Sequence, residues 1–523
     1  MTDEPQERRT GLDELLARRA LTDDAARPDK VGKRHAAGGR TARENLADLV
    51  DEGTFVEYGR FATAAQEQRR SVDELIRTTP ADGLVGGTAR VNGALFGDRA
   101  ACAVMSYDYL VMAGTQGMRG HHKSDRLIGL VERLRLPAVF FAEGGGGRPG
   151  DTDYPVVSAL DVESFALWAR LSGVVPRIAV VAGRCFAGNA VIAGCSDLIV
   201  ATRSSNLGMA GPAMIAGGGL GHFEPEEIGP IDVQTRNGVV DVEVADEAEA
   251  VAVTKRLLGY FQGDLEDWTA PDQTTLRTTL PERERQAFDV RPVVSTLADE
   301  GSVTFLRERF APELVTALAR IEGRPVGVVA NQSTSMAGAI TSDAADKAAR
   351  FLQLCDAFGF PVLSLVDTPG MMVGPDAEKT ALVRHSSRLL VAGARLQVPL
   401  VGVVLRRGYG LGAQAMLGGS THQPVLTLAW PDAHLGPMGL EGAVRLAMRT
   451  ELEAIEDPAE RERTVRELTA AYREHAAALN AARVFEIDDV IDPAETRAVV
   501  AATFAAAARE GRVRGSSRPV DTW

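Results

Sequence analysis

The chain has 523 residues, of which 45% are hydrophobic and 24% charged, a composition typical of a globular protein with two or more domains. Its formal net charge of -14 is the opposite of what a general binder of nucleic acid or anionic membranes needs. We find no apolar run long enough for a membrane span, and Met1 to Lys33 lacks the apolar core of a secretory signal, so we expect a cytoplasmic protein. The cysteines form no CxxC pair, so no metal site is predicted.

The most informative feature of the sequence is an internal repeat. The segment that starts at Met112 (MAGTQGMRGHHKSDRLIGLVERLRLPAVFFAEGGG) matches without a gap the segment that starts at Met336 (MAGAITSDAADKAARFLQLCDAFGFPVLSLVDTPG), at an offset of 224 residues. A long repeat of two units is typical of a duplicated domain, because a solenoid needs several shorter units. We predict a charged N-terminal extension over residues 1–40 and two related domains over residues 41–265 and 266–523.

The elements expected in each copy are clearest in the second. The apolar run VGVVANQ predicts a strand, the helical periodicity of residues 343–359 follows it, and residues 361–367 predict a second buried strand. Residues 398–406 predict a further strand that leads into a Gly-rich turn. This alternation predicts an α/β fold with largely parallel strands. The polar residues 263–291 predict a linker, and residues 459–482 predict one amphipathic helix.

Two Gly-rich turns lie at equivalent places in the copies, where a strand leads into a helix: GRCFAGNA over residues 183–190 and RGYGLGAQA over residues 407–415. The first N–H groups of a helix have no acceptor within it, so they can stabilise a developing oxyanion. The alternative is that the glycines only let helix and strand pack closely. Because both copies keep such a turn, we favour a functional role.

The first copy also carries GGGGRPG over residues 144–150. Although it contains GxGxxG, Pro149 interrupts the helix that a dinucleotide site needs, so we favour a loop that a ligand approaches closely. Glu143 and Asp367 end equivalent strands; they could act as acid or base, but a cap of the next segment is the favoured interpretation. We find no GxSxG, HExxH or Walker A sequence. Two anion-stabilising turns without a side-chain nucleophile suit two enolate-like anions, such as a thioester enolate and the ureido group of biotin.

In combination, these residues resemble the carboxyltransferase (β) subunits of acyl-CoA carboxylases, such as those for propionyl-CoA and methylcrotonyl-CoA. The resemblance covers about residues 35–500 and rests on these pieces, in this order: TARE (from Thr41), DEGTFVE (Asp51), RVNG (Arg90), VANQ (Val329), DAADKAARF (Asp343), VDTPG (Val366), RRGYG (Arg406), AWPDA (Ala429) and IDDVIDP (Ile487). It implies two tandem crotonase-like (ClpP-like) ββα-spiral domains. It also implies an active site between the N-half of one subunit and the C-half of another, in a homo-hexamer (a trimer of dimers or a dimer of trimers).

The resemblance implies roles for particular residues. Gly188 and Asn189 would form the oxyanion hole for the acyl-CoA thioester, with Gly144, Gly145, Gly146 and Ala187 beside the substrate. Leu411 and Gly412 would hold the carbonyl oxygen of biotin, flanked by Gly410, Ala413 and Gln414. The internal repeat instead pairs Gly188–Asn189 with Gly412–Ala413, so Gly412 is common to both alignments. Biotin itself would remove the α-proton, in agreement with the lack of a side-chain base.

The chain has neither a biotin-accepting Met-Lys-Met nor an ATP-binding module. The resemblance therefore implies a partner, a biotin carboxylase/biotin carrier (α) subunit that supplies carboxybiotin. Acyl-CoA is the expected substrate. The chain departs from the family pattern at three places. The first turn has Asn189 where relatives usually have a second glycine, and the loop after Glu143 is GGGG. The third place is Gln414, where propionyl-type enzymes tend to have Asp, and it hints at a larger or branched acyl pocket.

Three other functions compete with this interpretation. A decarboxylase subunit would move the carboxyl group from an acyl-CoA to biotin, and the sequence barely separates it because the half-reaction is reversible. A non-catalytic scaffold subunit of a carboxylase complex is a second alternative, which the departures at Asn189 and Glu143 keep open. An enoyl-CoA hydratase-like enzyme would need paired glutamates in the N-half, and no convincing pair is present.

Overall fold

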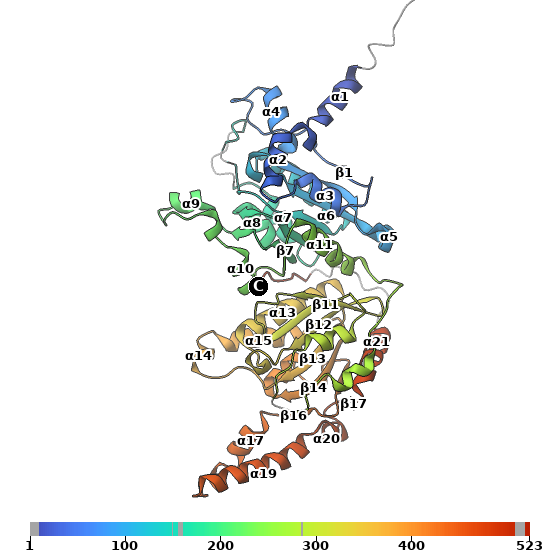
Figure 1. The fold of residues 1–523 in the computed structure, drawn as a ribbon, viewed down its shortest axis with the longest axis vertical. Helices are drawn as coiled ribbons and strands as arrows, with labels where there is room; N and C mark the ends of the chain where they lie inside the picture. Colours follow the sequence, from blue (N-terminus) through green and yellow to red (C-terminus); the bar gives the residue numbers. More distant parts are fainter. Residues whose placement is uncertain (1–9, 149, 155–159, 284–285, 508–517) are drawn as a thin grey trace, which may run out of the picture. The chain divides into compact units, whose positions relative to one another are not determined.

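The computed structural model describes residues 10–148, 150–154, 160–283, 286–507 and 518–523. The chain divides into two compact units (Figure 1): the first extends to Gly263 and includes residues 518–522, and the second begins at Asp264. Each unit is built around its own main sheet.

The main sheet of the first unit has an antiparallel edge followed by parallel strands. Strands β1, β2 and β3 are antiparallel, and the remaining neighbours are parallel. The described strands lie in the order β1 (Val56–Glu57), β2 (Leu84–Arg90), β3 (Ala101–Tyr107), β4 (Ala138–Phe141), β5 (Arg177–Val181), β7 (Leu198–Thr202) and β9 (Val242–Val244). A separate parallel pair is formed by β6 (Arg184–Phe186) and β8 (Asn206–Gly208).

The α-helices of the first unit precede, connect and follow these strands. They are α1 (Thr10–Ala20), α2 (Pro28–Ala36), α3 (Ala42–Leu49), α4 (Val72–Thr78), α5 (Gly93–Phe96), α6 (Met118–Leu134), α7 (Ser164–Arg170), α8 (Gly188–Gly194), α9 (Pro212–Gly217), α10 (Ile231–Arg236) and α11 (Glu247–Gln262). Leu127 and Val131 of α6, Trp168 of α7 and Ile192 of α8 pack in one hydrophobic cluster with side chains of β2, β3 and β4.

The main sheet of the second unit repeats this arrangement. Its first three strands are antiparallel and the others are parallel. The described strands lie in the order β10 (Thr304–Leu306), β11 (Leu314–Ile321), β12 (Arg324–Asn331), β13 (Val362–Thr368), β14 (Leu400–Tyr409), β15 (Leu426–Ala429) and β17 (Asp489–Val490). Strand β16 (His434–Gly436) pairs with the end of β14, as β8 pairs with β6 in the first unit.

The α-helices of the second unit are α12 (Arg291–Leu297), α13 (Ser342–Phe358), α14 (Pro375–Glu378), α15 (Leu382–Ala394), α16 (Gly410–Met416), α17 (Leu440–Ala447), α18 (Arg449–Glu453), α19 (Pro458–Ala476), α20 (Ala478–Arg483) and α21 (Thr496–Ala507). The predicted helix over residues 343–359 is α13, and the predicted strands over residues 361–367 and 398–406 are β13 and β14. The predicted α/β class is therefore confirmed.

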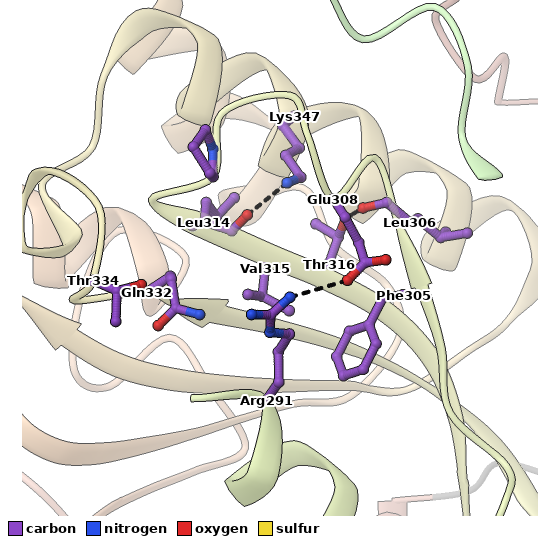
Figure 2. A pocket seen from close by; sticks show the side chains of 11 residues that line it. Arg291, Phe305, Leu306, Glu308, Leu314, Val315, Thr316, Gln332, Thr334 and Lys347 are labelled. Carbon is purple, nitrogen blue, oxygen red and sulfur yellow. Dashed lines mark hydrogen bonds and ion pairs between the residues drawn. The ribbon is translucent and has the colours of Figure 1, made fainter. Parts of the chain in front are cut away.

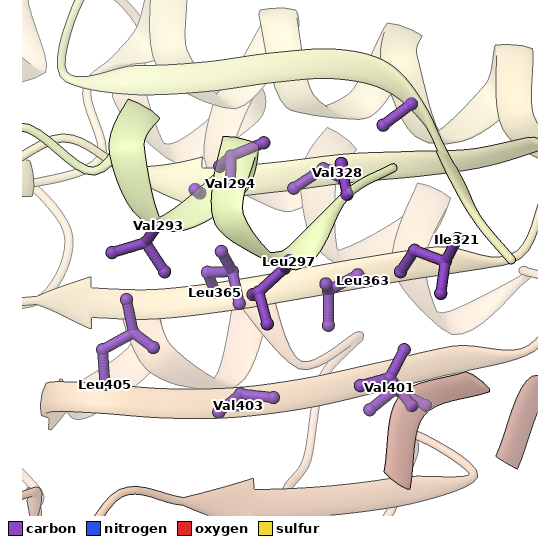
Figure 3. Close-up of a cluster of buried hydrophobic side chains, with 14 of the residues drawn as sticks. Val293, Val294, Leu297, Ile321, Val328, Leu363, Leu365, Val401, Val403 and Leu405 are labelled. Carbon is purple, nitrogen blue, oxygen red and sulfur yellow. The ribbon is translucent and has the colours of Figure 1, made fainter. Parts of the chain in front are cut away.

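The core of the second unit shows why its strands read as continuous apolar runs. Side chains that alternate along β13 and β14, such as Leu363, Leu365 and Val403, pack against Val293 and Leu297 of α12 (Figure 3). On the opposite face, a Cβ at Gly327 of β12 would lie 3.2 Å from the ring of Phe351 in α13. Because helices cover both faces, both sets of side chains are apolar.

A buried lysine occupies the same place in each unit. Lys347 of α13 donates from Nζ to the carbonyl oxygens of Phe310 (2.8 Å) and Leu314 (2.6 Å), and Figure 2 shows it pointing to Leu314. Lys123 of α6, its partner in the sequence repeat, donates to the carbonyl oxygens of Gly59 (3.2 Å) and Leu84. Burial lowers the pKa of Lys347 to about 7 and that of Lys123 to about 8.

Two sequence expectations differ from the structure. The helix predicted over residues 459–482 is interrupted at Ala477, which has extended backbone angles and pairs with His434, so α19 ends at Ala476 and α20 begins at Ala478. The expected linker is not an open tether, because Leu276 and Phe288 lie in the hydrophobic core of the second unit. Their isolated positions among polar residues give no periodic signal.

Among the described residues, no helix is long and apolar enough to cross a membrane. Within the same ranges, no group of three or more His, Cys, Asp or Glu side chains is arranged to hold a metal ion.

Candidate active site

The Gly-rich turn of the first unit leads from β6 into α8. Ala187 is the N-cap of the helix, with a φ of 52°, and its N–H donates to the carbonyl of Gly208 (3.1 Å). No side chain caps α8, and the N–H groups of Gly188 and Asn189 belong to its first turn, where helix residues offer no acceptor. A Cβ at Gly188 would collide with the amide of Gln116 and lie 2.9 Å from the ring of Phe165. The turn therefore needs glycine at position 188.

The turn of the second unit leads from β14 into α16, which also lacks a side-chain cap. Gly410 has a φ of 58°, and Leu411 is 61% exposed. Gly412 is buried against the loop after β13: a Cβ there would lie 2.5 Å from the carbonyl carbon of Gly370. Ala413 is buried and Gln414 is exposed. The first turn of α16 thus presents Leu411 and Gly412 N–H groups in the same way as α8 presents those of Gly188 and Asn189.

Strand pairing fixes how the two turns correspond. Phe186 pairs with Gly208 and Tyr409 with Gly436, and the next residue in each chain, Ala187 or Gly410, has a positive φ. Gly188 therefore corresponds to Leu411 and Asn189 to Gly412, which is the alignment implied by the family resemblance. The gap-free repeat is one residue out of register here. In the paired strands, Ala138 corresponds to Val362 at the repeat offset of 224 residues, whereas Arg177 corresponds to Leu400, which is one residue less.

The loop of Gly144, Gly145 and Gly146 lies beside the first turn. A Cβ at Gly146 would lie 2.7 Å from that of Ala187. The three N–H groups donate within the protein: to Arg184 O (2.7 Å), Ala113 O (3.2 Å) and Asn189 Oδ1 (2.9 Å), respectively. The structure thus brings these glycines to the turn, but their N–H groups are already engaged. Pro149, which we expected to interrupt the helix of a dinucleotide site, lies outside the described residues.

Each loop begins at a buried carboxylate held by arginine. Arg34 of α2 donates from both Nη atoms to Glu143, at 2.7 and 2.8 Å. In the second unit, Arg406 (2.8 Å) and Arg407 (2.7 Å) donate to Asp367. Burial raises the pKa of Glu143 to about 7, and Arg34 opposes that rise. The favoured interpretation of both carboxylates as caps was wrong, because their oxygens are bound by guanidinium groups.

Opposite each loop lies a left-handed turn with the sequence MAG. Met112, Ala113 and Gly114 all have positive φ, and so do Met336, Ala337 and Gly338. Consecutive non-glycine residues in this region are strained, which is common at functional sites where the surroundings hold the backbone. The turns pack on the strand-end residues: a Cβ at Gly114 would lie 2.7 Å from Glu143 O, and one at Gly338 would lie 2.6 Å from Asp367 O.

Sequence reasoning missed Arg34, Gln116 and Phe165. Arg34 lies in the segment that we took for an extension, yet it supplies the cation for Glu143. The sequence did carry a signal that Glu143 needs a cation from elsewhere. Gly183 of the first unit corresponds to Arg406 of the second, so the first unit lacks the arginine that the second has at this place. Gln116 and Phe165 offer no such signal, since only the folded chain brings them to Gly188.

Comparison with known proteins identifies the family of this chain. A profile described as the carboxyl transferase domain matches residues 33–518. The chain belongs to the carboxyl transferase family. It is 32% identical to the methylmalonyl-CoA carboxyltransferase 12S subunit of Propionibacterium freudenreichii subsp. shermanii, over 97% of this chain and 96% of that one.

Two solved structures extend the comparison of this carboxyltransferase. A transcarboxylase 12S structure, described as a hexamer with methylmalonyl-coenzyme A bound, superimposes with a TM-score of 0.83 at 29% identity and covers 99% of both chains. A single-chain, multi-domain long-chain acyl-CoA carboxylase superimposes with a TM-score of 0.91 at 54% identity over 95% of this chain. This chain spans about half (49%) of the length of that protein. The predicted family and its two crotonase-like domains are confirmed, and the chain is a biotin-dependent acyl-CoA carboxyltransferase.

Proposed function

We propose that this carboxyltransferase moves a carboxyl group from carboxybiotin, carried on a separate chain, to the α-carbon (or vinylogous γ-carbon) of an acyl-CoA. The observation that carries the proposal is the pair of uncapped helix N-termini, α8 and α16, at equivalent positions in the two units. Each follows a strand and lies against a glycine loop. Two such donor sets suit a reaction in which negative charge develops on two oxygens.

In the first unit, the N–H groups of Gly188 and Asn189 would donate to the thioester oxygen as the enolate forms. Backbone donors fixed in a folded turn need no rearrangement when charge develops, and a single donor of this kind commonly contributes a few kcal/mol. The substrate would lie against Ala187 and the backbone of Gly144, Gly145 and Gly146. Since those three N–H groups are engaged internally, the loop would contribute shape and not hydrogen bonds.

In the second unit, the N–H groups of Leu411 and Gly412 would hold the ureido oxygen of biotin. The residues present fit that group, because the first turn of α16 offers N–H donors without a side-chain cap and Leu411 is exposed. Gly410, Ala413 and Gln414 would flank it. When bound, carboxybiotin supplies the CO₂ unit and a basic ureido group.

The carboxylates near the two turns support a mechanism without a side-chain base. Glu143 is bound on both oxygens by Arg34, and Asp367 is bound by Arg406 and Arg407. A carboxylate tied into such pairs is poorly placed to take a proton from a substrate carbon. Both side chains instead fix the strand ends from which the glycine loops start.

We further propose that the acyl group is long. The basis is the 54% identity to a protein described as a long-chain acyl-CoA carboxylase. A biotin carboxylase/biotin carrier subunit is the proposed partner, and a homo-hexamer the proposed assembly, as in the 12S protein described as a hexamer.

The function is tested by decarboxylation in the reverse direction. The purified chain is incubated with free biotin and a series of carboxylated acyl-CoAs: malonyl, methylmalonyl, methylglutaconyl and α-carboxylated chains of about C12 to C18. We expect biotin-dependent loss of the carboxyl group, fastest with the long chains. Acyl-CoA binding without turnover on any of them would contradict the proposal and favour a scaffold subunit.

The assignment of the second turn is tested by Gly412→Val. The added side chain would meet the backbone of Gly370, so we expect biotin-dependent turnover to be lost while acyl-CoA binding, measured by calorimetry, is retained. Gly442→Ala is the matched control, because open space surrounds a Cβ at Gly442. Normal turnover by a folded Gly412→Val variant would refute the assignment.

A further inference from the structure

The side chain of Asn189 points away from solvent and into the frame of the first turn. It is fully buried. Its Nδ2 donates to the carbonyl oxygens of Gly114 and Glu143, each at 3.3 Å, and its Oδ1 accepts from the N–H of Gly146 at 2.9 Å. One side-chain amide therefore connects the helix that bears the turn to the MAG turn, to the strand end and to the glycine loop.

The second unit makes the corresponding connection with a different residue. Asn331, at the end of β12, donates from Nδ2 to the carbonyl of Gly338 (3.3 Å) and accepts from the N–H of Asp367 (3.2 Å). Gly338 and Asp367 are the repeat partners of Gly114 and Glu143. An asparagine amide thus joins the MAG turn to the strand end in both units.

The two asparagines are not repeat partners. Asn331 corresponds to Tyr107, whose hydroxyl instead accepts from Gln116 Nε2 (2.8 Å). Asn189 corresponds to Gly412, which has no side chain. The first unit has the amide on the helix and none at the strand, and the second unit has the reverse. This reciprocal exchange indicates that the amide is needed and that its origin in the chain is not.

Steric contacts show what the Asn189 amide holds. A Cβ at Gly144 would collide with both the Asn189 amide and the carbonyl of Gly114, so no side chain fits between them. Ala113, whose φ of 54° is strained, precedes Gly114, whose carbonyl accepts from the Asn189 amide. Small shifts of a reacting group by about 1 Å can reduce rates by roughly two orders of magnitude, so contacts that fix such a frame affect turnover.

We propose that Asn189 is a positioning residue for the acyl-CoA half of the site: its side-chain amide fixes the glycine loop and the MAG turn relative to the N–H groups of α8. In the biotin half, Asn331 joins the MAG turn to the strand end. The inference rests on the proposed function. It also gives a physical reason for an asparagine where the second unit has Gly412.

The test compares kinetic constants of the reverse decarboxylation in the intact protein. Asn189→Gly keeps the N–H and removes only the amide side chain, so we expect kcat to fall about tenfold or more, with the KM for free biotin unchanged. Asn331→Gly should affect the biotin half instead: we expect its KM for biotin to change and its KM for the acyl-CoA to stay unchanged. Asn189→Ser, a smaller polar change, is the second variant if Asn189→Gly is poorly folded.

Two further measurements separate positioning from mere stabilisation. Hydrogen exchange of the segment from Phe141 to Arg148 should quicken in Asn189→Gly, because the N–H of Gly146 loses its acceptor. Adding Tyr107→Asn to Asn189→Gly places an amide where the second unit has one and should restore part of kcat.

Wild-type kcat in folded Asn189→Gly, measured per active protein well below its Tm, would overturn the inference. An inactive wild-type protein would instead overturn the proposed function.

Discussion

At the scale of single residues, the two units show the same contacts made from different positions. Asp367 is paired by Arg406 from the adjacent strand, whereas Gly183 occupies that place in the first unit and Arg34 reaches in from α2. A Cβ at Gly183 would collide with the Glu143 side chain, so the glycine leaves the space that the distant guanidinium approaches. The N-terminal segment therefore belongs to the support of the site.

We expect Arg34→Gln to destabilise the protein strongly. Removing one partner of a buried ion pair leaves a carboxylate without its countercharge, which typically costs about 3–5 kcal/mol. Urea unfolding measures the change. Arg18→Gln is the control, because Arg18 and Glu14 form a solvent-exposed pair at 3.8 Å and should contribute at most about 1 kcal/mol. Equal unfolding midpoints for the two variants would contradict this role.

Gln414 is the residue for which we expect an effect on substrate preference. It is exposed on the first turns of α16, next to the buried Ala413. Gln414→Asp should shift the preference among carboxylated acyl-CoAs toward shorter chains, as read from kcat/KM ratios across the chain-length series. An unchanged profile would remove Gln414 from the acyl pocket.

At the scale of elements, the strands and helices could be predicted because burial on both faces makes their periodicity plain. The strand over residues 361–367 and the helix over residues 343–359 are examples. The turns at positions 188 and 412 were found for a similar reason, since glycine is needed where a backbone approaches within about 3 Å. The gap-free repeat alone misplaces their correspondence, because the second unit has one residue less between two strands, whereas the family resemblance gives the alignment that strand pairing shows. Arg34, Gln116 and Phe165 come from elements that only tertiary packing brings together.

The paired lysines of α6 and α13 predict a pH dependence of stability. Burial lowers the pKa of Lys347 from 10.5 to about 7, so between these pH values the unfolded chain binds a proton that the folded chain does not. The free energy of unfolding should therefore rise with pH across this window, by up to about 1.4 kcal/mol per pH unit for such a group.

The contribution of Lys347 is isolated by Lys347→Met. This variant should be less stable, since several carbonyl oxygens lose their donor, and its free energy of unfolding should rise less steeply between about pH 7 and 10. Lys379→Met, which changes an exposed lysine, should keep the wild-type slope. Identical slopes in all three proteins would show that Lys347 is charged when folded.

At the scale of the whole molecule, each unit leaves large apolar side chains exposed. In the first unit these include Met209, Met214 and Leu220, and in the second Leu446, Leu479 and Phe485. Large apolar side chains that form an exposed patch usually mark an interface. They agree with the proposed hexamer, in which each site would need two subunits.

We expect light scattering to give the mass of six chains. Leu220→Asp and Leu479→Asp should lower that mass, because a carboxylate would be buried in an interface without a partner, and activity should fall with it. Arg18→Gln should keep the wild-type mass. Full activity in a dissociated variant would show that one chain holds a complete site.

The exchanged asparagines also bear on how this gene can change. Any lineage that carried the amide on the strand could lose it only after the helix had acquired one, and the reverse holds for the other half. Each intermediate on such a path would carry both amides. The two halves thus differ by paired substitutions. A copy of one half could replace the other only if the residues that support its turn were copied with it. Recombination within the duplicated gene is constrained accordingly.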